Sequence, residues 1–113
     1  MQRTFGYALD GIGWSFRNHR NFQIHTGFAF IALISGLLLN IARQDWILLL
    51  FTIILVYFAE MVNTALEEIT DLVTVKWAKQ AKIAKDVSAG MVLITVAGAI
   101  MVGLLIFIPY LSG

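Results

Sequence analysis

Apolar residues fill three long stretches of this chain, and short polar segments separate them. The stretches run over residues 26–42, 46–69 and 87–108. A helix needs about 20 apolar residues to cross a bilayer, and the three stretches approach or exceed this length. The first and third contain no charged residue, whereas the second becomes polar in its second half. The pattern therefore predicts three transmembrane helices.

A different pattern precedes the first stretch. Over residues 4–20, the apolar residues Phe5, Leu9, Ile12 and Phe16 recur at spacings of four, three and four. This spacing places them on one face of a helix. An amphipathic helix of this kind lies in the membrane interface rather than crossing it, and packing against the membrane helices is compatible with that position. We predict a surface helix over residues 4–20.

Composition agrees with a membrane protein. The 113 residues are 59% hydrophobic and only 13% charged, and the mean hydropathy is +0.82. No segment alternates with the period of two that a β-hairpin needs. We therefore predict an all-α fold, with residues 1–113 as one integral membrane domain. The absence of cysteine excludes disulfides, thiolate catalysis and zinc–sulfur sites.

The basic residues are distributed unevenly between the predicted loops. Only Arg43 follows the first stretch. The other seven of the eight lie before the first stretch or between the second and third: Arg3, Arg17, Arg20, Lys76, Lys79, Lys82 and Lys85. Basic residues concentrate on the cytoplasmic side of membranes. This predicts a cytoplasmic N-terminus, a C-terminus outside and a short surface helix over residues 72–86 on the cytoplasmic side.

The second stretch contains a stripe of polar residues. At 100° per residue, Glu60 and Glu67 lie within about 20° of each other and about 10 Å apart along a helix. Asn63 and Thr64 fall on the same side, and Asp71 continues the stripe. A carboxylate in hydrocarbon costs a few kcal/mol and usually belongs to a functional pathway or site. The stripe therefore indicates a wet cleft, a bound cation or both.

Several chemistries are compatible with this stripe. The deeper carboxylate could accept a proton from a lipid hydroxyl, and the shallower one could hold a magnesium ion that bridges nucleotide phosphates. A proton or cation relay is another possibility, as is simple polar contact between helices. Downstream, Lys82, Lys85 and Asp86 lie at the start of the third stretch, where lysines can contact phosphates. No Walker A motif or kinase glycine loop is present.

Three segments carry a resemblance to a known family. They are AEMVNTALEEITDLV at residues 59–73, AKIAKDVSAG at residues 81–90 and NFQIH at residues 21–25. Together they resemble the prokaryotic diacylglycerol kinase family, most closely its Gram-positive undecaprenol kinase-like branch. The resemblance implies a homotrimeric enzyme of the bacterial cytoplasmic membrane, with its active site on the cytoplasmic side. Such an enzyme transfers the γ-phosphoryl group of MgATP to the hydroxyl of a membrane lipid.

The resemblance also implies roles for individual residues. Glu60 matches the general base, Asn63 supports the site, and Glu67 matches a glutamate that binds Mg²⁺ beside the nucleotide phosphates. These roles suit phosphoryl transfer, which needs mainly positioning, charge neutralisation and a group that orients the attacking hydroxyl. Nucleotide contacts are implied for Tyr7, Lys85 and Asp86.

The chain departs from the family pattern at residue 19 and over residues 76–78. His19 stands where the family usually has a second metal-binding glutamate, and Mg²⁺ prefers oxygen ligands to imidazole. Lys76, Trp77 and Ala78 replace a Glu-Tyr-His segment near the expected adenine pocket. We expect a lipid kinase acting on undecaprenol or, as a second acceptor, diacylglycerol. The alternative is a non-catalytic paralogue or a small proton- or cation-conducting membrane protein.

Overall fold

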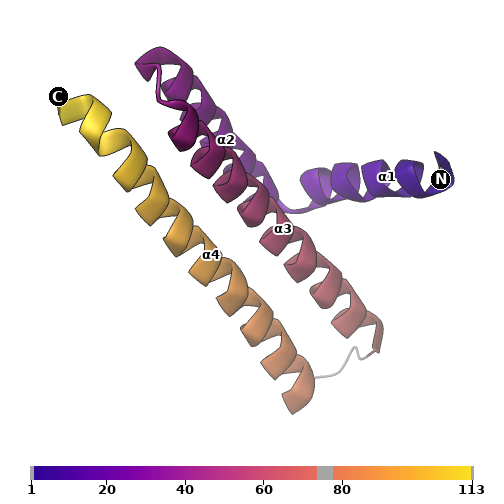
Figure 1. Cartoon of the computed structure of the whole chain (residues 1–113). Helices are drawn as coiled ribbons and strands as arrows, with labels where there is room; N and C mark the ends of the chain where they lie inside the picture. Colours follow the sequence, from indigo (N-terminus) through magenta and orange to yellow (C-terminus); the bar gives the residue numbers. More distant parts are fainter. Residues whose placement is uncertain (1, 74–77, 113) are drawn as a thin grey trace.

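The computed structural model describes residues 2–73 and 78–112, and every regular element in these residues is an α-helix (Figure 1). The four helices are α1 (Gln2–Asn18), α2 (Arg20–Leu39), α3 (Arg43–Val73) and α4 (Lys79–Ser112). The predicted all-α fold is therefore confirmed for this part of the chain. Lys76 and Trp77 lie outside the described residues.

Three of the helices have the length and composition of membrane spans. α2, α3 and α4 are each long and apolar enough to cross a bilayer. In their most apolar windows, only 11%, 22% and 6% of the residues are buried within the chain. Most of the apolar surface is thus left for contact with lipid or with other protein. The predicted set of three membrane-length helices is confirmed.

The long helices form a bundle in which α3 is the central element. α3 packs extensively against α4 and less extensively against α2, whereas α2 and α4 have little contact. α1 points away from the bundle at a steep angle, as Figure 1 shows. Its placement at a membrane interface stays a prediction.

The helix boundaries differ from the predicted ones for local reasons. α1 ends at Asn18 rather than residue 20, because His19 has an extended backbone with φ −122° and ψ 114°. α2 ends at Leu39 rather than residue 42, because Asn40 adopts the left-handed conformation with φ 54°. Asparagine tolerates this conformation better than most residues. Its N–H donates to the carbonyl of Gly36 and closes the helix end.

The predicted separate helix over residues 72–86 is wrong in the described residues. α3 continues to Val73, and residues 79–86 form the first turns of α4. Lys82 and Asp86, four residues apart on α4, pair at 2.6 Å. This (i, i+4) contact is one that a continuous helix allows. At the other end, α4 continues past Pro109 to Ser112.

The junction of α1 and α2 is held by side chains on both sides of His19. Gln23 Nε2 donates to the Phe16 carbonyl at 2.8 Å. The buried ring of Phe22 lies between Phe16 and Tyr57, with ring centroids 6.3 and 5.1 Å away. These contacts connect α1, through Phe22, to Tyr57 in the middle of α3, one turn before Glu60.

The apolar core is small and lies at the opposite end of the bundle. Ile41, Leu49 and Ile106 are buried together there. Beside them, the Tyr110 hydroxyl donates to Asp45 and accepts a hydrogen bond from the Ala42 N–H. This end of the bundle is closed by apolar packing and hydrogen bonds, whereas Glu60, Asn63 and Glu67 lie toward the other end of α3.

Candidate active site

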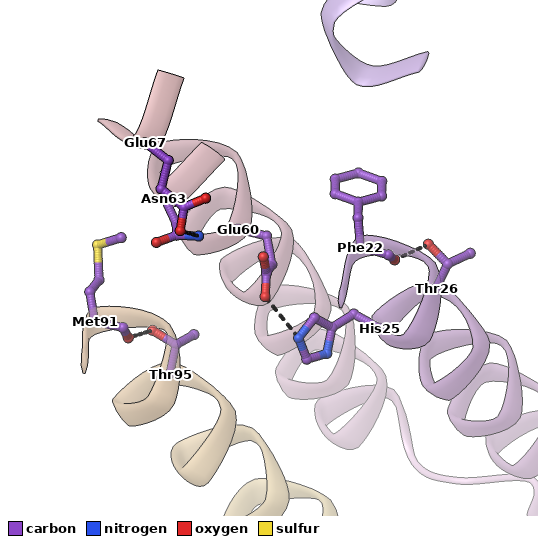
Figure 2. A network of polar contacts seen from close by, with 8 residues as sticks. All are labelled: Phe22, His25, Thr26, Glu60, Asn63, Glu67, Met91 and Thr95. Atoms are coloured by element: carbon purple, nitrogen blue, oxygen red, sulfur yellow. Dashed lines mark hydrogen bonds and ion pairs between the residues drawn. The ribbon is translucent and has the colours of Figure 1, made fainter. Parts of the chain in front are cut away.

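Glu60 is the most deeply placed acid of the polar stripe. It lies on α3 and is only 2% exposed. Its Oε1 atom is 2.9 Å from Nε2 of His25, which comes from α2. Figure 2 shows the Glu60 carboxylate directed toward the imidazole ring. α2 and α3 are antiparallel neighbours, so a residue near the start of α2 meets one in the second half of α3.

The buried polar atoms of this region are not all satisfied. Glu60 Oε1 is within ion-pair distance of His25, yet it accepts no well-aligned hydrogen bond from a described residue. Thr64 Oγ1, one helical turn further along α3, is also buried without a partner among the described residues. An unsatisfied buried group costs about 1–3 kcal/mol. In native proteins such groups call for a specific explanation, and a catalytic role is one.

Asn63 connects α3 to α4 and to Glu67. The buried Ser88 hydroxyl of α4 donates to Asn63 Oδ1 at 2.6 Å. Asn63 Nδ2 in turn donates to Glu67 Oε1 at 3.3 Å. The contact with Ser88 fixes the amide, and the amide then orients the carboxylate. Figure 2 shows Asn63 and Glu67 on the α4 side of α3, away from the His25 contact.

Two exposed ion pairs continue the polar surface beyond Glu67. Lys85 Nζ donates to Asp71 Oδ1 at 2.6 Å, and this pair connects α4 to α3. Lys82 Nζ donates to Asp86 Oδ2 at 2.6 Å within α4. Exposed pairs of this kind contribute little to stability, because water screens the two charges. They are therefore weak enough to be exchanged for contacts with a charged ligand.

The structure brings some predicted site residues together and leaves others apart. Glu60, Asn63 and Glu67 follow one another along α3, but Glu60 faces α2 while Asn63 contacts α4. Tyr7 on α1 is 70% exposed. His19 lies at the α1–α2 junction with its ring 5.4 Å from that of Trp14. No group of three or more His, Asp or Glu residues in residues 2–73 and 78–112 is arranged to hold a metal ion.

The sequence analysis missed three polar contributors. His25 contacts Glu60, Ser88 contacts Asn63, and the Tyr57 hydroxyl donates to Thr26 Oγ1 at 2.7 Å. His25 had a detectable signal, because it is an ionisable residue directly before a predicted span. Ser88 offered only weak evidence, since serine is common where membrane helices pack closely.

These features define an integral membrane protein with a polar site at one end of a helical bundle. The sequence model for prokaryotic diacylglycerol kinase matches residues 6–107. The chain therefore belongs to the prokaryotic diacylglycerol kinase family.

Two relatives show the same relationship over nearly the whole chain. The undecaprenol kinase of Bacillus subtilis (strain 168) is 38% identical over 109 residues, which cover 96% of this chain and 89% of the relative. The diacylglycerol kinase of Synechocystis sp. (strain PCC 6803) is 38% identical over 107 residues, which cover 94% of this chain and 61% of the relative. This protein is accordingly a membrane lipid kinase, and the polar site is its candidate active site.

Proposed function

We propose that this kinase transfers the γ-phosphoryl group of MgATP to the hydroxyl of undecaprenol. The similarity to the undecaprenol kinase, which extends over 89% of that relative, supports this acceptor. Diacylglycerol is the second candidate, supported by the similarity to the Synechocystis enzyme. A non-catalytic or ion-conducting role has no support from these similarities.

The observation that carries the proposal is the buried oxygen of Glu60 without an aligned hydrogen bond. A lipid hydroxyl that donates to this carboxylate would satisfy it. As the hydroxyl oxygen attacks the γ-phosphorus, Glu60 would accept its proton as general base. Phosphoryl transfer depends mainly on positioning and electrostatic stabilisation, so one oriented carboxylate is the main group the acceptor side requires.

The residues beside Asn63 fit a magnesium ion that is carried by the nucleotide. Mg²⁺ is usually bound by one or two carboxylates together with substrate phosphates and water. Glu67 is partly buried and has one oxygen oriented by Asn63, which suits this arrangement. A site built from protein ligands alone would need more carboxylates than the described residues bring together. When bound, the ion would neutralise charge on the phosphates.

The nucleotide would lie over the exposed ends of α3 and α4. Lys85 is the proposed phosphate contact, and Asp71 is the carboxylate that it would leave on binding. Asp86 and Tyr7 are proposed to contact the nucleotide from α4 and α1. His19 is proposed to donate a hydrogen bond to phosphate rather than to bind the metal, because imidazole is a poor Mg²⁺ ligand.

The orientation of the chain and its assembly belong to the same proposal. The basic residues of α1, of the start of α2 and of the first turns of α4 support a cytoplasmic position for the active site and the N-terminus. α1 would lie in the interface, and the C-terminus outside. Three thin helices leave most of their apolar surface uncovered, so a neighbouring subunit is proposed to wall each site in a homotrimer. Native mass spectrometry from membrane mimetics would detect that trimer.

A direct assay tests the function. Purified protein in nanodiscs would receive MgATP with undecaprenol, with diacylglycerol or with a fully esterified glyceride that has no hydroxyl. We expect undecaprenol to give the highest kcat/KM and the esterified lipid to give no product. A higher kcat/KM for diacylglycerol would overturn the acceptor assignment. Failure to phosphorylate either alcohol would overturn the proposed function itself.

A further inference from the structure

His25 contacts the buried Glu60 and is itself more exposed than Glu60. Its side chain is 18% exposed, whereas that of Glu60 is 3% exposed. Among the described residues, Glu60 is the only acidic partner within 4 Å of the His25 ring. A general base this enclosed takes up one proton in each turnover and must lose it before the next. The route by which this proton leaves is therefore part of the catalytic cycle.

The surroundings of Glu60 and His25 offer few other routes. His25 lies at the edge of a groove of about 490 Å³ between α2, α3 and α4, and the groove is lined almost entirely by apolar side chains. Apolar side chains cannot carry a proton. Tyr57, which also lines the groove, already donates its hydroxyl proton to Thr26. Glu67 is about 10 Å from Glu60 along α3, too far for direct transfer.

We infer that His25 is a positioning residue that also takes the proton from Glu60 and passes it to water. The inference rests on the proposed role of Glu60 as general base. The separation of 2.9 Å between Nε2 and Oε1 suits direct proton transfer. The contact is close but not aligned, so a small rotation of the imidazole ring would make or break it during turnover.

The proton count balances over one cycle. At rest, Glu60 and His25 share one proton between Oε1 and Nε2. The lipid O–H bond breaks as the new O–P bond forms and the bond from the γ-phosphorus to the bridging oxygen of ADP breaks. The lipid proton moves to Glu60, and the pair then holds two protons. The imidazole ring turns away from Glu60 and Nε2 releases its proton to water, while Nδ1 keeps its proton throughout. When the ring turns back, Nε2 accepts the proton from Glu60 and the resting pair is restored.

This role predicts an unusual kinetic pattern for His25→Gln. Glutamine retains hydrogen-bonding capacity but cannot carry a proton in this way. The first turnover begins with ionised Glu60, so its rate should stay within about threefold of wild type. Later turnovers should slow about tenfold or more, because Glu60 stays protonated after the first. Rapid-quench measurements in nanodiscs should therefore show a burst of one lipid phosphate per site.

Two further variants separate proton transfer from structural support. His25→Ala should regain steady-state turnover when imidazole is added to the buffer. Tyr57→Phe removes the neighbouring hydrogen bond between the same two helices, and it should show neither a burst nor a response to imidazole. Protection by MgATP against thermal unfolding will show that each variant retains its nucleotide site.

The result that would overturn the inference is equal slowing of the first and later turnovers in His25→Gln without imidazole rescue in His25→Ala. That outcome would mean that His25 only supports the fold or orients Glu60. Steady-state turnover of His25→Gln within twofold of wild type would overturn it as well. A wild-type enzyme that phosphorylates no lipid alcohol would instead overturn the proposed function, and this inference with it.

Discussion

The two glutamates of the polar stripe occupy different environments although one heptad separates them. Glu60 is buried and contacts α2 through His25. Glu67 is partly buried and receives a hydrogen bond from Asn63, which is itself connected to α4. The stripe was visible in the sequence because a helix has a fixed angular period. Which neighbouring helix each acid faces depends on packing, and periodicity contains no information on that.

Replacing the two glutamates separately should affect different kinetic constants. Glu60→Gln keeps the size of the side chain but removes the base, so kcat should fall by about 10² or more while the KM for ATP changes little. Glu67→Gln should first raise the Mg²⁺ concentration needed for half-maximal activity. Steady-state kinetics across ATP and Mg²⁺ concentrations would measure both effects. Equal changes in nucleotide affinity for both variants would contradict the assigned roles.

The sequence resemblance predicts a metal-binding position at residue 19, where this chain has the imidazole of His19 instead of a carboxylate. If the site is a weakened form of the family's, His19→Glu adds an oxygen ligand and should tighten the dependence on Mg²⁺ and raise turnover. His19→Ala is the matched control. Titration with Mg²⁺, Mn²⁺ and Zn²⁺ would compare the variants. An unchanged metal response in both would show that position 19 does not belong to the site.

At the scale of the helices, the Asp71–Lys85 pair connects α3 and α4 where the phosphates are proposed to bind. Asp71→Asn removes the partner that Lys85 must leave. Because water screens an exposed pair, freeing Lys85 has a small effect, and the KM for ATP should fall by up to about fivefold. An increase in KM for Asp71→Asn would show that Asp71 itself helps to bind the nucleotide.

The elements themselves were largely predictable, because a membrane helix requires a long apolar run and little else. The residues at which the helices begin and end were less predictable. The left-handed Asn40 shortened the first predicted span, and continuation of α4 back to Lys79 replaced the predicted surface helix. The charged residues that suggested a separate surface helix over residues 72–86 are also compatible with a helix that extends beyond the membrane. His25 was not predicted as a site residue, because its importance arises only from contact with a distant part of the chain.

At the scale of the whole molecule, the lengths of α3 and α4 have a consequence for the membrane around the protein. They contain 31 and 34 residues, or about 46 and 51 Å at a rise of 1.5 Å per residue. The hydrocarbon layer of a bilayer is about 30 Å thick. Because most of the charged residues of both helices lie at one end of the bundle, the excess length should project from the hydrocarbon on that side.

The thickness of the lipid layer should then determine how deep in the membrane the active-site residues lie. A thicker bilayer would draw the level of Glu67 and Lys85 toward hydrocarbon, where charged groups and MgATP are disfavoured. A thinner one would place Glu60 nearer the headgroups and water. Turnover measured in phosphatidylcholine bilayers of increasing acyl length should therefore pass through a maximum. An activity independent of acyl length would show that the protein holds its surrounding lipid at a fixed thickness. A maximum would mean that the lengths of α3 and α4 determine the depth at which a lipid hydroxyl meets a water-soluble phosphate donor.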